Sequence, residues 1–245
     1  MRYCVVMEYD GSSYHGFQIQ PNVITIQKVV EDSLKHIYQT DIKIVAASRT
    51  DAFVHAKHQV FHYDSDTIIP TNRLASIINK QLPPDIRVIE ILEVSSDFHA
   101  RYDVVQKEYR YIISKQNADV FSQRYVLFID YEVDVTKIKQ AMHYFVGEHD
   151  FRTFSKASDK ESTTRKIDSF DLIEKEDQII FSIKGNGFLH HMVRIIVGTL
   201  LEVGRGNLSP SDVKSILDEK NRVYAPFVAQ PNGLYLWNIL YKQDK

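Results

Sequence analysis

The sequence predicts an α+β fold of two ferredoxin-like halves, each with an antiparallel or mixed sheet. The order strand, helix, strand, strand occurs once in each part of the chain, and that order is typical of ferredoxin-like units. The chain has 245 residues, of which 44% are hydrophobic and 25% charged, as in ordinary globular proteins of one or two domains. No low-complexity linker interrupts the sequence, and we expect the two halves to be residues 1–104 and 105–245.

The first half is expected to begin with a strand at Arg2–Tyr9. A helix at Ile26–Tyr38 is predicted by apolar residues that recur on one helical face, with Thr25 as the N-cap. The next helix is expected to end before Pro83, because proline cannot continue a helix. The other elements predicted in this half are strands at Ile42–Ala47, Lys57–Tyr63 and Arg87–Val94 and a helix at Thr71–Lys80.

The second half repeats this order. Runs at Lys166–Lys175 and Gln178–Lys184 flank a short polar turn and predict a hairpin. A strongly apolar helix is expected at Phe188–Val203. The other predicted elements are strands at Gln106–Ser114 and Gly233–Tyr241 and helices at Thr136–Phe145 and Ser209–Asp218.

The loop S-R-T-D-A-F-V-H-A, from Ser48 to Ala56, joins two predicted strands and carries one carboxylate, Asp51. Loops that end a strand are where rigid scaffolds present reactive groups. The only other acid nearby is Asp41, so a paired-carboxylate site is not indicated. Asp51 is either an ordinary turn residue beside a surface cation, Arg49, or one carboxylate kept ionised for use as a nucleophile or base.

Arg194 is the only formally charged residue between Phe188 and Leu201. A helix that is apolar on nearly every side is buried, and a buried arginine is seldom left unpaired. Arg194 therefore either extends to the surface, forms a structural ion pair, or meets a functional carboxylate or phosphate.

Basic and aromatic residues interleave in a pattern that suits RNA. Basic groups bind phosphates and aromatic faces stack on bases, although either stretch is equally compatible with a solvated face. One stretch combines Arg101, Lys107 and Arg110 with Tyr102, Tyr109 and Tyr111, and the other contains Arg152, Lys156, Lys160, Arg165 and Lys166. On spacing alone, Tyr109 suits the core as well as it suits a functional site.

The bulk composition restricts the class of protein. A net charge of -2 argues against an unstructured basic coat, so a nucleic-acid partner would need a local basic patch. Cys4 is the only cysteine, which excludes an intrachain disulfide and a cysteine metal cluster. The sequence has neither a signal peptide nor an apolar run of about 18 residues, so we expect no membrane segment and a cytoplasmic location.

No metal or cofactor site is expected. His58 and His62 share one face of a predicted strand whereas His55 points away, so three histidine ligands do not converge. His190 and His191 are neighbours on a predicted helix and cannot converge either. The sequence also contains no phosphate-binding loop and no complete dinucleotide motif.

Strings along nearly the whole chain resemble the tRNA pseudouridine synthase A (TruA) family. The loop around Asp51 resembles the R-T-D-A-x-V-H-A active-site loop of that family. The other matching strings are Y-D-G-S-S-Y-H-G-F-Q-I-Q from Tyr9, L-P-P-D-I-R-V from Leu82, F-H-A-R from Phe98, K-E-Y-R-Y from Lys107, G-E-H-D-F from Gly147, the run Gly185–Gly206, and G-L-Y-L from Gly233.

The resemblance implies a cofactor-free isomerase that converts uridine to pseudouridine at positions 38 to 40 of the tRNA anticodon stem-loop. The two halves would join around a central active-site cleft, and a homodimer would bind each tRNA. Asp51 would be the nucleophile, or the base of a glycal route. Arg194 would pair with Asp51 and lower its pKa, and Tyr109 would stack on the target uracil and help to handle its C5 proton.

The resemblance and the basic and aromatic pattern together suggest which residues bind the substrate. Arg49 either lies on the surface or helps to displace the target nucleotide from its stack, a step that costs a few kcal/mol. The residues expected to contact the substrate are Arg49, Phe53, His55, Arg101, Lys107 and Tyr109.

The chain departs from the family pattern at a few positions. Phe53 and Ser48 stand where the family usually has glycine, and F-V-A-Q from Phe227 replaces a P-T-A-P-like string. Phe53 therefore either reshapes the pocket and the choice of target or fills a gap in the core. Such changes suit a second, specialised paralogue. The alternatives are a non-catalytic RNA-binding member of the same scaffold, which the presence of Asp51 argues against, and a synthase with another RNA target.

Overall fold

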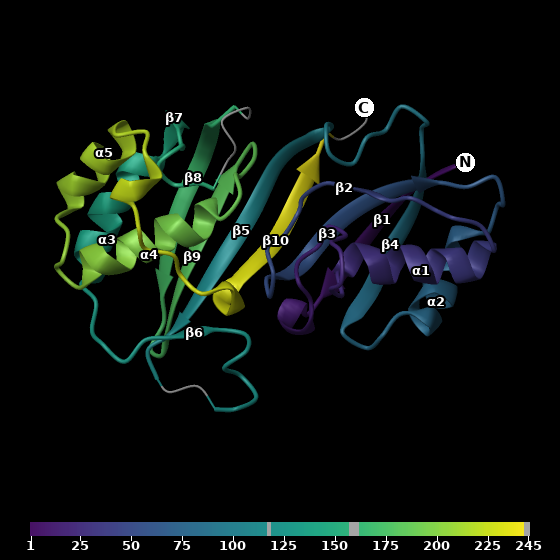
Figure 1. The fold of residues 1–245 in the computed structure, drawn as a ribbon, viewed down its shortest axis with the longest axis horizontal. Helices are drawn as coiled ribbons and strands as arrows, with labels where there is room; N and C mark the ends of the chain where they lie inside the picture. The colour runs from purple at the N-terminus through teal and green to yellow at the C-terminus, as the bar shows by residue number, and fades with distance from the viewer. Residues whose placement is uncertain (117–118, 157–161, 243–245) are drawn as a thin grey trace. The chain divides into compact units, whose positions relative to one another are not determined.

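The chain folds as two units in a computed structural model that describes residues 1–116, 119–156 and 162–242 (Figure 1). The first unit comprises Met1–Val105 together with Tyr235–Lys245, and the second comprises Gln106–Leu234. Both units combine strands with helices, which confirms the predicted α+β class.

The first unit has the strand–helix–strand–strand–helix–strand order of a ferredoxin-like fold. Its central strand, β1, pairs antiparallel with β3 on one side and with β4 on the other, and the short β2 pairs antiparallel with β3. The elements are β1 (Arg2–Tyr9), α1 (Ile26–Tyr38), β2 (Val45–Ala46), β3 (His55–Asp64), α2 (Thr71–Gln81) and β4 (Ile86–Val94), with a 3-10 turn at Gly11–Ser13.

The last strand, β10 (Leu234–Tyr241), adds to the sheet of the first unit. It runs parallel to the start of β3, where Tyr235 lies opposite His55 and Leu236 opposite Ala56. The division expected from the sequence put all of residues 105–245 in one half, whereas this pairing groups β10 with β3. The chain therefore returns to the strand that follows the Asp51 loop.

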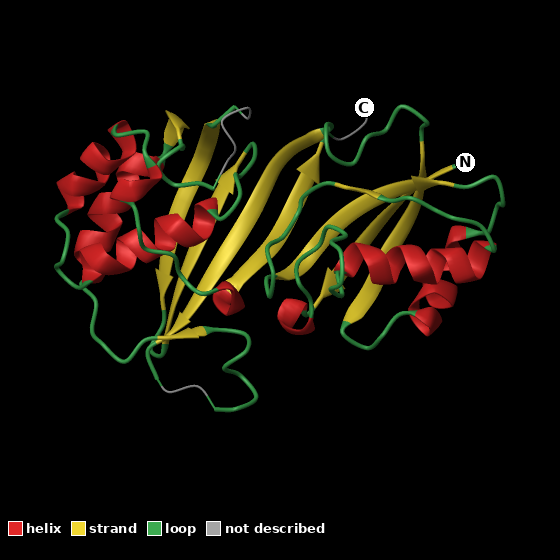
Figure 2. Cartoon of the chain, in the orientation of Figure 1, coloured by secondary structure: helices red, strands yellow, loops and turns green. Residues whose placement is uncertain are grey.

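In the second unit, β9 lies between β5 and β8 and is antiparallel to both, and β7 pairs with the other edge of β8. The helix α3 contacts α4 and α5, and Figure 2 shows these three helices grouped together. The elements are β5 (Val104–Ser114), β6 (Leu127–Phe128), α3 (Val135–Met142), β7 (Gly147–Asp150), β8 (Thr164–Glu174), β9 (Gln178–Gly185), α4 (Met192–Gly204) and α5 (Pro210–Asp218), with 3-10 turns at His143–Phe145, Arg222–Tyr224 and Pro231–Gly233.

Each unit has its own aromatic core. In the first, the rings of Tyr3 and Tyr63 stack with centroids 5.3 Å apart, and the hydroxyls of Tyr38 and Tyr63 lie 3.0 Å apart. In the second, the rings of Phe145 and Phe154 meet edge to face at 5.0 Å, and both are fully buried. Edge-to-face and offset stacks of this kind add to the stabilisation from apolar burial, so each unit is stabilised from within.

Two expectations about the elements were wrong. The strand predicted at Ile42–Ala47 is reduced to Val45–Ala46. The helix predicted from Phe188 begins at Met192, because His191 has a left-handed backbone with φ 62°. Thr25 is the N-cap of α1, as predicted, although its buried hydroxyl makes no hydrogen bond among the described residues.

None of the helices in the described ranges is long and apolar enough to cross a membrane.

Candidate active site

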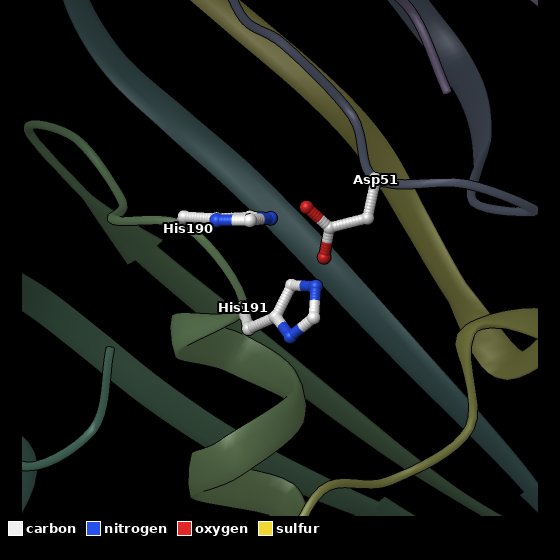
Figure 3. A group of neighbouring side chains, drawn as sticks. All are labelled: Asp51, His190 and His191. Carbon is white, nitrogen blue, oxygen red and sulfur yellow. The ribbon is translucent and has the colours of Figure 1, made fainter. Parts of the chain in front are cut away.

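The Asp51 loop connects β2 to β3 and is held by side chains of the neighbouring strands. The Tyr9 hydroxyl and the Thr50 hydroxyl form a buried hydrogen bond of 2.8 Å. Gln59 donates from Nε2 to the Ser48 carbonyl oxygen at 2.8 Å. Asp51 itself is half-buried and projects from this loop, as Figure 3 shows. The loop therefore presents its one carboxylate from an ordered backbone.

A second segment, Asp10–Phe17, holds the loop on both sides of Asp51. The Phe17 N–H donates to the Thr50 carbonyl at 3.1 Å, and the Phe53 N–H donates to the Tyr14 carbonyl at 3.0 Å. These two bonds bracket the carboxylate along the chain. They also satisfy backbone groups that an irregular loop cannot pair by itself.

The segment Asp10–Phe17 is in turn fastened to the start of β4. The Asp10 N–H donates to the Asp85 carbonyl at 2.9 Å, and the Tyr14 hydroxyl donates to Asp85 Oδ1 at 2.7 Å. Burial and this hydrogen bond raise the pKa of Tyr14, so its hydroxyl stays protonated at neutral pH and remains a donor. Neither Tyr14 nor Asp85 was a candidate from the sequence, although both lie in strings that resemble the family.

Phe53 lies in the loop with a left-handed backbone, φ 66°, and 40% of its surface is exposed. Its ring is tilted against His15, with centroids 5.5 Å apart. The ring is therefore on the surface, and the expectation that it could fill a gap in the core was wrong. Glycine adopts this backbone without strain, which explains why glycine suits this position elsewhere.

Arg49 and His55 flank the same loop in different environments. Arg49 is exposed, and its Nη1 donates to Gln18 Oε1 at 3.1 Å. His55 has only 1% of its surface exposed and stacks on Tyr235 with ring centroids 4.8 Å apart. Such burial does not favour the direct substrate contact expected for His55.

Arg194 lies in the first turn of α4 and is half-buried, although most of that helix is buried. Its Nε donates to the Ala229 carbonyl at 2.8 Å, and its own carbonyl accepts from the Ala229 N–H at 3.0 Å. The F-V-A-Q segment thus fixes Arg194 through backbone atoms. The position of the guanidinium is set even though part of the side chain reaches the surface.

Tyr109 lies in β5 opposite Ile183 of β9 and is 5% exposed. Its ring meets Phe188 edge to face, with centroids 5.0 Å apart at 76°. Lys107, two residues earlier, lies opposite Gly185 and is half-buried. Both side chains therefore belong to the second unit, close to the end of β9.

His190 and His191 lie in the turn before α4 and not on a helix (Figure 3). Their ring centroids are only 4.2 Å apart. The expectation that adjacent positions keep these rings apart was wrong, because the left-handed backbone of His191 changes the direction of its side chain. The Lys156 N–H donates to the His190 carbonyl at 3.0 Å, which ties the basic stretch to this turn.

The remaining basic residues are exposed or held locally. Arg101 is exposed, with its guanidinium 5.8 Å from the centre of the Tyr102 ring. Arg165 donates from Nη1 to the carbonyl oxygens of Ser162 and Thr164, at 2.9 and 2.7 Å. Lys166 Nζ lies 3.4 Å from Asp168 Oδ1. Lys160 of the basic stretch lies outside the described residues.

Comparison with known proteins gives consistent results. The family model described as tRNA pseudouridine synthase matches residues 5–103 and 141–242. The chain is 42% identical over 245 residues to tRNA pseudouridine synthase A of Exiguobacterium sibiricum, covering 100% of this chain and 98% of that protein. It is 43% identical over 236 residues to tRNA pseudouridine synthase A 1 of Bacillus cereus, covering 95% and 96% of the two chains.

A solved structure, titled "Structure of H/ACA RNP bound to a substrate RNA containing 2'-deoxyuridine", aligns with a TM-score of 0.39 and 16% identity. The alignment covers 80% of this chain and 44% of that one. A similarity of this size does not bear on function.

Gly16→Ala tests whether Asp10–Phe17 holds the Asp51 loop. Gly16 has φ +89°, and an added Cβ would lie 2.8 Å from the Thr50 carbonyl oxygen and 3.2 Å from the Asp51 carbonyl carbon. We expect the substitution to lower the free energy of unfolding by about 2 kcal/mol or more, because backbone strain and a backbone clash combine.

Gly206→Ala is the matched control, because φ there is +83° but nothing lies within 4 Å of the added Cβ. It should cost only the backbone strain of about 1–2 kcal/mol. Urea unfolding of both variants measures the difference. Equal losses would show that the loop tolerates displacement.

Proposed function

Because the chain belongs to the tRNA pseudouridine synthase family, we propose that it isomerises uridine to pseudouridine at positions 38 to 40 of the tRNA anticodon stem-loop. The observation that carries the proposal is a single half-buried carboxylate, Asp51, on a loop whose backbone is hydrogen-bonded on both sides. This loop lies inside the first matched segment, residues 5–103.

The reaction moves the uracil without adding or removing atoms overall. The bond from N1 to C1′ of the ribose breaks, the base turns, and C5 bonds to C1′. A proton is lost from C5 and one is gained at N1. Such a step needs neither an oxidant nor water as a reactant. It needs a group that reacts with the ribose after the N1–C1′ bond breaks and before the C5–C1′ bond forms. It also needs a site that keeps the free uracil in place.

Asp51 is proposed as that group. In one route its carboxylate attacks C1′ and holds the sugar as an ester while the base turns. In the other route it removes a proton from C2′, which gives a glycal, and returns the proton later. Both routes need an ionised carboxylate in a fixed position, and the hydrogen bonds at Thr50 and Phe53 support that requirement.

Arg194 and Tyr109 are proposed to complete the chemistry. Arg194 would be the cationic partner of Asp51 and would hold its oxygens in position. Its fixed Nε, bonded to Ala229, supports that role. Tyr109 would stack on the uracil and assist at C5, and its edge-to-face contact with Phe188 supports a defined ring orientation.

The exposed residues Arg49, Phe53 and Arg101, together with Lys107, are proposed to contact the tRNA, with the cations at phosphates and Phe53 at a base. A homodimer that binds one tRNA across both subunits is part of the same proposal. So is a cytoplasmic location, because tRNA resides there. These features come from the family resemblance.

Asp51→Asn should abolish pseudouridine formation while the protein stays folded and still binds tRNA. The substitution removes the charge at nearly constant size, and no other carboxylate was predicted to replace it. Mass spectrometry of an anticodon stem-loop transcript after incubation measures the product.

Asp41→Asn is the matched control, because Asp41 is exposed and forms an ion pair with Lys35, with Nζ and Oδ1 2.8 Å apart. It should retain full activity. Product formation by the Asp51 variant would exclude Asp51 from the mechanism. An inactive wild-type protein that binds tRNA tightly would instead favour the non-catalytic RNA-binding alternative.

Arg194→Met should lower the rate of the chemical step by at least about 100-fold, because a misplaced carboxylate loses most of its effect. Arg205→Met, at the end of the same helix, is the control; Arg205 pairs with Glu202 at 3.2 Å on the surface. Single-turnover rates and melting temperatures of both variants are compared. Unchanged turnover of the Arg194 variant would contradict the proposed pairing.

Phe53→Gly should leave the melting temperature almost unchanged, because loss of the surface contact with His15 is offset by relief of backbone strain. The relative rates at positions 38, 39 and 40 should change by roughly fivefold, as expected for a stacking contact of about 1 kcal/mol. Phe121→Gly, which removes a ring that is 80% exposed in another loop, is the control. An unchanged site preference together with a clear fall in stability would contradict a role in target choice.

A further inference from the structure

We infer that His55 is a positioning residue that holds Asp51 in place by accepting the Gly11 N–H at its Nδ1 atom. The two atoms lie 3.1 Å apart, and the bond is buried. The inference deepens the proposed function and rests on it for its kinetic test. In this role His55 does not make the substrate contact expected from the sequence, but positions Asp51 through the backbone of the segment that begins at Asp10.

The turn at Gly11 is shaped so that its N–H points at His55. Asp10 Oδ1 accepts from the Ser12 N–H at 2.9 Å and from the Ser12 hydroxyl at 2.6 Å, which closes a tight turn around Gly11. His55 Nδ1 also lies 3.1 Å from Asp10 Oδ1. One ring nitrogen cannot accept from Gly11 and donate to Asp10 at once, and the neutral ring with its lone pair on Nδ1 satisfies the Gly11 donor.

There is no room for Gly11 to move toward the loop. A Cβ added at Gly11 would lie 2.0 Å from the Val54 carbonyl oxygen, so the two backbones are already in close contact. The His55 ring is confined on another side by the stacked ring of Tyr235. The bond from Gly11 to His55 therefore joins two packed segments.

The effect of this bond reaches Asp51 through the segment Asp10–Phe17. That segment starts at the turn held by His55 and ends at the hydrogen bonds to Thr50 and Phe53. His55 thus fastens the loop directly, as the first residue of β3, and indirectly, through Gly11. If the acceptor is lost, the buried Gly11 N–H must find another partner, and the segment that brackets Asp51 shifts with it.

His55→Asn and His55→Leu form a matched pair for the test. Asparagine places its Oδ1 close to the position of Nδ1 and keeps the acceptor, whereas leucine has the same branching without a polar atom. We expect the leucine variant to lose roughly 10- to 100-fold in kcat, as for a misplaced catalytic group, with the tRNA dissociation constant within about threefold of wild type. The asparagine variant should keep kcat within about threefold of wild type, a limit set by the same geometric argument.

A second measurement does not depend on activity. Hydrogen exchange at the Gly11 amide should be slow in the wild type and in His55→Asn and faster in His55→Leu. Should the leucine variant fail to fold, His55→Gln replaces it, because its acceptor lies one bond farther along the side chain. The glutamine variant should then show the loss of kcat and the faster exchange.

The outcomes separate the two hypotheses. Equal losses of kcat in the asparagine and leucine variants, or unchanged Gly11 exchange in the leucine variant, would overturn the positioning role. A weaker tRNA affinity with unchanged kcat would overturn it in favour of a direct substrate contact. A wild-type enzyme without any pseudouridine product would refute the proposed function, and the exchange measurement would still decide whether Nδ1 holds Gly11.

Discussion

Two backbone hydrogen bonds, from Phe17 to the Thr50 carbonyl and from Phe53 to the Tyr14 carbonyl, determine the geometry of the Asp51 loop. An irregular loop has no ladder of its own to satisfy its N–H and C=O groups, so its order must come from another segment. Here that segment is Asp10–Phe17, which is itself held at Asp85 and at His55. Three strings that are distant in the sequence therefore form one structural unit.

Much of this organisation could be predicted from the sequence, because it is recorded in periodic patterns. The apolar face of α1 and the apolar run of β1 gave correct element types, and the family-like string around Asp51 located the candidate loop. The structure adds what periodicity does not encode. The burial of His55 and the contacts of Asp85 depend on which segments meet in space, and no local pattern specifies that.

Left-handed backbone at residues other than glycine accounts for several of the differences. His191 and Phe53 both have positive φ, at 62° and 66°. This conformation is uncommon for residues other than glycine, and at a bulky side chain such as Phe53 the surrounding structure must impose it. At His191 the left-handed backbone delays the start of the predicted helix and brings two imidazole rings together. At Phe53 the left-handed backbone allows the loop the same turn that a glycine would allow, and the aromatic ring lies on the surface.

Where the chain departs from the family pattern, at Phe53 and in the F-V-A-Q segment, the residues are held by hydrogen bonds of their backbone atoms. Ala229 holds Arg194 through its own carbonyl and N–H, so the flanking F-V-A-Q residues can differ without releasing the guanidinium. Phe53 is likewise held by its N–H. Backbone anchoring thus separates the parts of the site that must remain fixed from the side chains that are able to diversify.

The place of β10 has a consequence for how the protein is made. The edge of β3 at His55 and Ala56 is covered by Tyr235 and Leu236, which leave the ribosome long after β3 does. Until then the nascent first unit carries an open strand edge, and its His55 ring lacks the aromatic neighbour that confines it. N-terminal domains generally fold as units while synthesis continues, whereas the first unit here also includes β10, which is made after the whole second unit. The support that Tyr235 gives to the His55 ring, and through it to the Asp51 loop, is therefore added after the rest of the first unit has been synthesised.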